Sequence, residues 1–256
     1  MNTQNSSNVG FSSYLQRAAR NERANALNLP GVFALLEQLE AALAAAVTAA
    51  QRQDDGARLA PRFLLGRGYA CCLAAARLAL SGQVIEGFMP LRGAIEASWY
   101  ALHMSADPAP LNRVEIWMGR HNDDASKERC KREFTIKNVH QTHLGRDAEV
   151  AAIFHRLYEA TIDLGAHPNP RSILGVLTET ETPDGSQYNM AILTTDQRII
   201  VSTLERVVDV GIGVLKTFQL VFPQEFAAAG LAATIDRLID ASSATFRAWV
   251  EQAARD

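Results

Sequence analysis

Apolar residues recur at steps of three and four along most of the chain, the spacing that places them on one face of an α-helix. In residues 30–56, Pro30 suits a first helical turn and an Asp-Asp-Gly sequence ends the pattern. The same periodicity predicts further helices over residues 60–82, 88–104, 111–121, 147–165, 197–222 and 231–250. The polar run 123–133 has no apolar stripe, so it is either the outer part of a long helix or a mobile connection.

The helix predicted over residues 60–82 is apolar nearly all round, as expected for a helix enclosed by its neighbours. Alanine is abundant and aromatic residues make up only 7% of the chain, which suits closely packed helices better than a β-sandwich. The helix over residues 147–165 is expected to end with Gly165 in the left-handed conformation, because Pro168 cannot continue it.

The period changes after residue 172, where β-branched residues flank a Pro-Asp-Gly turn signal at residues 183–185. We expect a β-hairpin near residues 173–194, too small to be stable alone and therefore packed on helices. Thr194 followed by Gln197 fits a capping box at the start of the next helix.

The chain shows no internal repeat and no linker that would separate domains. The predicted fold is therefore all-α: one multi-helix bundle over residues 1–256 with a small β-hairpin. The first ten or so residues are polar, and we expect them to be disordered.

Charge and cysteine content limit the partners and the cellular compartment that we expect for the protein. A formal charge of −3 provides no basic field for nucleic acid. Cys71, Cys72 and Cys130 cannot form a complete disulfide framework and suit small buried side chains in a reducing compartment. The N-terminus lacks a secretory signal, and apolar runs such as residues 42–50 fall short of the ~20 residues that span a bilayer. We expect a cytoplasmic protein that does not enter a membrane.

Strong catalytic and cofactor motifs are missing from the sequence, which lacks GxxxxGK[ST], GxGxxG after a strand, HExxH, GxSxG, paired CxxC and Glu-x-x-His. No cofactor is therefore expected. The one metal-like spacing is His140 and His143, which share a helix face at i and i+3. A pair of surface or half-buried histidines explains this spacing as well, and it is the preferred interpretation.

Four residues that are mostly polar follow one side of the helix over residues 88–104. Arg92, Glu96, Trp99 and His103 are spaced four, three and four apart, so they stack along one stripe. Either Arg92 and Glu96 form a structural clamp to a neighbouring helix, which we prefer, or they border a pocket for an anion or a small polar ligand.

The segment LGAHPNPRS holds a histidine between a helix end and two prolines. If His167 faces Arg92 and Glu96, Arg92 and Arg171 would hold an anionic ligand beside Tyr158, while Glu96 and His167 would exchange protons as catalytic residues. The simpler alternative is that His167 caps exposed carbonyls at the helix end.

The stretches GQVIEGFMPLRGAIEASWYALHM and YEATIDLGAHPNPRS resemble a bacterial all-helical family of unassigned activity, over about residues 65–175. They resemble, more distantly, the HEPN helical bundles of toxin–antitoxin and defence systems. That resemblance implies a helical bundle that forms dimers. The ribonuclease motif of many HEPN proteins, an arginine followed by a histidine with four to six residues between them, is absent around all six histidines.

Three functional hypotheses follow. The first is a binding module that self-associates through an apolar helix face, suggested by the inward stripes and by Gly211 and Gly213. The second is an enzyme or receptor for a small polar or anionic ligand that uses the Arg92, Glu96 and His167 set. The third, RNA binding through residues 127–132, is disfavoured by the interspersed acidic residues and the missing aromatics.

Overall fold

The structure is a computed structural model that describes residues 10–51, 56–109, 111–166, 170–174, 177–183 and 185–255. The N-terminal residues 1–9, expected to be disordered, lie outside these ranges. The longer helices are α1 (Phe11–Asn28), α2 (Pro30–Ala50), α3 (Gly56–Ser81), α4 (Phe88–Ser105), α8 (Ala148–Thr161), α10 (Gln197–Val221) and α12 (Leu231–Ala253). Shorter elements are α5 (Asn112–Met118), η1 (Gly119–His121), α6 (Asp124–Glu133), α7 (Ile136–Leu144), η2 (Ile162–Ala166), α9 (Pro170–Leu174) and α11 (Pro223–Ala228).

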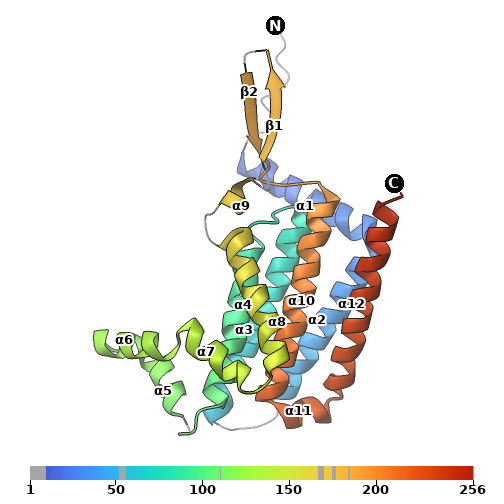
Figure 1. The fold of residues 1–256 in the computed structure, drawn as a ribbon. Coiled ribbons are helices and arrows are strands. Elements are labelled where there is room, and N and C mark those ends of the chain that lie inside the picture. Colours follow the sequence, from blue (N-terminus) through green and yellow to red (C-terminus); the bar gives the residue numbers. More distant parts are fainter. Residues whose placement is uncertain are drawn as a thin grey trace.

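The all-α prediction is confirmed, because the long helices other than α1 lie side by side as a bundle, with α1 across one end and a hairpin beyond it (Figure 1). α10 runs through the middle and contacts α2, α3, α4, α8 and α12. The largest fully buried side chains include Trp99 in α4, Phe154 in α8 and Phe218 in α10. The centre of the core therefore lies where these three helices meet.

Side-chain caps start α6, α7, α8 and α10. Asp123 and Asp147 accept hydrogen bonds from the backbone N–H groups three residues later, which starts α6 and α8. The polar run that we read as an outer helix or a connection is thus a separate capped helix. The predicted capping box of α10 is wrong: Asp196 is its N-cap, and Thr194 accepts a bond from the Asp196 N–H instead.

Three glycines allow close packing within the chain. A Cβ atom on Gly211 would lie 2.7 Å from Leu39, and one on Gly213 would lie 2.5 Å from Phe154. Both glycines therefore serve the core and not a contact between copies. Gly165 does not adopt the predicted left-handed conformation, because its φ of 173° is extended; a Cβ there would lie 2.2 Å from the Ile85 carbonyl oxygen.

The hairpin pairs β1 (Leu177–Thr182) with β2 (Gly185–Met190) in antiparallel register, as the turn signal predicted. Our expectation that it packs on the helices is wrong. All six residues of β2 are exposed, and the hairpin projects beyond α1 at one end of the bundle (Figure 1).

The prediction that α3 is enclosed by its neighbours is also wrong. Leu59, Phe63 and Leu73 are 49%, 68% and 40% exposed, respectively. By length and composition alone, Pro30–Ala50 and residues 58–81 are apolar enough to cross a membrane, contrary to the short apolar runs read from the sequence. Core helices of soluble proteins pass the same test, so this is weak evidence for a membrane protein.

Candidate functional site

Three of the predicted site residues meet where α4 packs on α8. The Arg92 Nε atom lies 2.8 Å from Glu96 Oε1, and the two side chains are 25% and 31% exposed. The Arg92 guanidinium carbon lies 5.2 Å from the centre of the Tyr158 ring, within range of a cation–π interaction. Burial raises the pKa of Tyr158, and the Arg92 charge opposes that rise. This arrangement joins the two helices, as the clamp interpretation expects.

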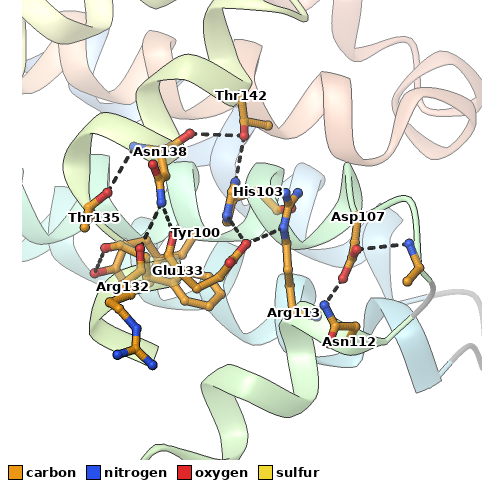
Figure 2. Close-up of polar contacts among 12 residues, drawn as sticks. Tyr100, His103, Asp107, Asn112, Arg113, Arg132, Glu133, Thr135, Asn138 and Thr142 are labelled. Carbon is orange, nitrogen blue, oxygen red and sulfur yellow. Dashed lines mark hydrogen bonds and ion pairs between the residues drawn. The ribbon is translucent and has the colours of Figure 1, made fainter. Parts of the chain in front are cut away.

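His103 lies on the same stripe of α4 but belongs to a different group of residues (Figure 2). Its side chain is 3% exposed, with Nε2 3.0 Å from Glu133 Oε1 and Nδ1 2.7 Å from Thr142 Oγ1. Because the Glu133 carboxylate needs a donor, Nε2 carries the proton and the Thr142 hydroxyl donates to Nδ1. Burial, followed by the nearby Arg113 charge, lowers the pKa of His103.

Arg113 completes this network, which ties α5 and α6 to the end of α4. Its Nε donates to Glu133 Oε1 at 2.8 Å, and its Nη1 donates to the His103 carbonyl at 2.8 Å. Its backbone N–H donates to the Asp107 carboxylate at 2.6 Å. Asn138 of α7 donates to the carbonyls of Arg132 and Glu133, as Figure 2 also shows.

The order threonine, histidine, carboxylate has the connectivity of a catalytic triad. However, His103 is almost fully buried, and Thr142 also lies 3.2 Å from the carbonyl of Asn138 within its own helix. The Thr142 hydroxyl has one proton, which can go to His103 Nδ1 or to that carbonyl but not to both. The group is therefore best explained as a structural network.

The two candidate metal ligands, His140 and His143, both contact Trp99. The Trp99 indole N–H donates to His143 Nδ1 at 3.0 Å, and burial lowers the pKa of His143 to about 4. The His140 ring lies against the His155 ring at a tilt of 38°, with 4.3 Å between ring centres. Over the described ranges, no group of three or more His, Cys, Asp or Glu residues could hold a metal ion. Both rings pack against aromatic side chains, and the Nε2 atom of each is buried with no hydrogen-bond partner among the described residues.

The other half of the predicted pocket cannot be placed. His167 lies outside the described residues. Arg171 belongs to α9, but its side chain lies outside them too. Two grooves in the described part of the chain lie away from Arg92 and Glu96. A groove of about 660 Å³ runs between α8, α10 and α12, and one of about 420 Å³ lies between α1, α2 and α3.

The buried thiols are not candidate nucleophiles. Cys71, Cys72 and Cys130 are free and buried, as the sequence suggested. Burial, with a smaller contribution from Cys71, raises the pKa of Cys72 to about 12, and burial also raises the pKa of the other two thiols. A thiolate is the reactive form, so burial suppresses their chemistry.

Sequence reasoning missed an exposed apolar surface on α3. We call it the α3 stripe: Leu59, Phe63, Gly66, Ala70 and Leu73. These residues are spaced four, three, four and three apart, which places them on one side of the helix. A Cβ atom on Gly66 would have nothing within 4 Å, so this side of α3 is open. The spacing was present in the sequence but was hidden among the other apolar residues of α3.

Comparison of the chain with family models, curated proteins and solved structures gives no match.

Proposed function

We propose that the protein is an interaction module that self-associates through the α3 stripe. The observation that carries the proposal is an uncovered apolar face with coiled-coil spacing on a helix that otherwise packs in the core. Alternating steps of four and three form the seam along which two helices pack. The three large side chains of the stripe are 40–68% exposed in a single copy.

Association removes this surface from water. Burying the exposed part of each large side chain contributes on the order of 1 kcal/mol, because full burial of such a side chain is worth about 1.5–3 kcal/mol. A symmetric dimer buries each of them twice. Phe63, the largest and most exposed, is the expected centre of the contact.

Light scattering on the full chain tests the proposal. Phe63→Glu places a charge in the stripe, whereas Val250→Glu changes a similarly exposed apolar residue of α12, 59% exposed against 68%. The wild-type chain and Val250→Glu should be dimeric, and Phe63→Glu should be monomeric with an unchanged helical circular-dichroism spectrum. A wild-type chain that remains monomeric at high concentration overturns the proposal.

A ligand-binding role for Arg92, Glu96 and Tyr158 is the second candidate, and it is favoured by the assembly of these three predicted residues from two helices. An anion would have to compete with Glu96 for the guanidinium. NMR titration of the chain with inorganic phosphate tests this candidate, using Arg92→Gln as the control. Identical, small shift changes in both proteins exclude a phosphate site there.

A further inference from the structure

The α3 stripe also indicates how two copies meet. We infer that α3 packs against α3 of a second copy in antiparallel orientation, about a two-fold axis level with Gly68; this inference rests on the proposed self-association. Four of the five stripe residues, Phe63, Gly66, Ala70 and Leu73, are placed symmetrically about that position, whereas Leu59 lies level with the partner's Arg77. Phe63 faces the partner's Leu73, and Gly66 faces the partner's Ala70. Each contact therefore occurs twice, as in an isologous interface.

The small residues lie at the centre of this arrangement. Gly66 and Ala70 flank the axis, and an atom added at Gly66 meets nothing in its own chain. Small side chains at the crossing point let two helix backbones approach closely. The large residues then lie on either side of the centre and are free to interlock.

An apolar groove receives the largest of them. The groove of about 420 Å³ between α1, α2 and α3 is lined by Phe33, Leu36, Leu73, Ala76 and Leu80, with charged residues at its rim. Because the antiparallel pairing sets Phe63 level with the partner's Leu73, its ring lies at the mouth of the partner's groove. A single copy thus carries both the projecting side chain and the recess that it fits.

Charges beside the stripe also match. Arg62 lies on the side of α3 that faces α2, because Tyr69, seven residues later, donates to Glu40 of α2. The Nε and Nη2 atoms of Arg62 are buried and have no hydrogen-bond partner among the described residues. Exposed Glu37 lines the groove beside Leu73.

The two-fold axis passes between the two α3 helices and is perpendicular to both, so α2 of each copy lies on the same side of the helix pair. Arg62 is then level with the partner's Ala74 and on the side of the partner's Glu37; because its Nε and Nη2 atoms are buried in their own copy, the two opposite charges attract across the interface without direct contact. A parallel pairing would instead set Arg77 against the partner's Arg77 and Phe63 against the partner's Phe63.

Chemical cross-linking distinguishes the two orientations. Leu59, 49% exposed, and Arg77, whose side chain is 79% exposed, are level with each other across the antiparallel interface. Leu59 is about 27 Å along the axis from the partner's Leu59, at a rise of 1.5 Å per residue. A short bismaleimide cannot span that distance. The variants are Leu59→Cys and Arg77→Cys, treated separately and after mixing, with the wild-type chain as control for its buried cysteines.

Antiparallel packing predicts covalent dimers in the mixture, several-fold above either variant alone. Covalent dimers in each separate variant contradict the inference and indicate parallel packing. If neither the mixture nor the separate variants cross-link although light scattering shows wild-type dimers, the antiparallel pairing is wrong, whereas self-association stands. A monomeric wild-type chain removes the proposed function itself.

Discussion

Removal of the Glu133 carboxylate should destabilise the protein more than its position on a short outer helix suggests. Glu133 accepts hydrogen bonds from His103 Nε2 at 3.0 Å and from Arg113 Nε at 2.8 Å. His103 is 3% exposed, Arg113 20% and Glu133 itself 31%. In Glu133→Ala, the buried imidazole N–H loses its acceptor, and the guanidinium loses its charged partner.

The cost follows from these exposures. A buried donor left without an acceptor costs about 1–3 kcal/mol. Water can solvate part of Arg113, so we assign it the smaller share. Together they give roughly 2–3 kcal/mol, a substantial part of the 5–15 kcal/mol by which proteins are usually stable. With a urea m-value of about 3 kcal/mol/M, the unfolding midpoint should fall by about 1 M.

Urea unfolding followed by circular dichroism at pH 7 measures this loss. Glu128→Ala is the matched control, because Glu128 lies on the same helix and pairs with Lys131 at 2.7 Å on the exposed surface; its midpoint should not change. Glu133→Gln retains an acceptor for His103 and should lie between the wild-type protein and Glu133→Ala. Equal midpoints for the two alanine variants would refute the assignment of a structural network to Glu133.

Two further predictions concern the core. Burial holds the pKa of His143 at about 4, against 6.5 in the unfolded chain. Between these two pH values the unfolded state binds more protons than the folded state, so the protein loses stability as the pH falls from 6.5 to about 4. That difference in pKa amounts to about 3 kcal/mol of stability. The variant His143→Gln retains an acceptor for the Trp99 indole and should flatten the dependence of the urea midpoint on pH. An unchanged slope would contradict this prediction. Gly213→Ala would place a Cβ 2.5 Å from Phe154 and should lower the free energy of unfolding by about 1–3 kcal/mol, measured in urea. Gly31→Ala, whose Cβ would have its nearest contact at 3.8 Å, should not lower it. Equal losses of stability in the two variants would exclude the close packing at Gly213.

The periodicity of apolar residues predicted the helices that form the bundle, because these helices bury one face. It did not predict α1, which is held to the end of α3 by polar contacts. Asn25 donates to the Leu80 carbonyl at 2.8 Å, and Asn21 donates to the Ser81 carbonyl at 3.0 Å. Asparagine carries no apolar signal, so no pattern marked this helix. For α3, the same method recognised the helix but could not show that one of its sides lacks a neighbour.

The candidate site was predictable only where its contacts are local. The Arg92–Glu96 pair follows from i, i+4 spacing and forms as expected. The partner of His103, Glu133, is 30 residues away in a run that reads as solvated surface. Only the packing of α7 against α4, which places the end of α6 beside His103, brings them together, and a single sequence does not contain that information.

The central claim is that the α3 stripe holds two copies together. Sedimentation equilibrium of the wild-type chain and of Phe63→Glu, across a wide range of concentrations, tests it most directly. The account predicts that the wild-type mass approaches twice the chain mass of 27.9 kDa as concentration rises, whereas Phe63→Glu stays at the mass of one chain. A wild-type chain that keeps the monomer mass throughout, or a variant that associates as strongly as the wild type, would contradict it.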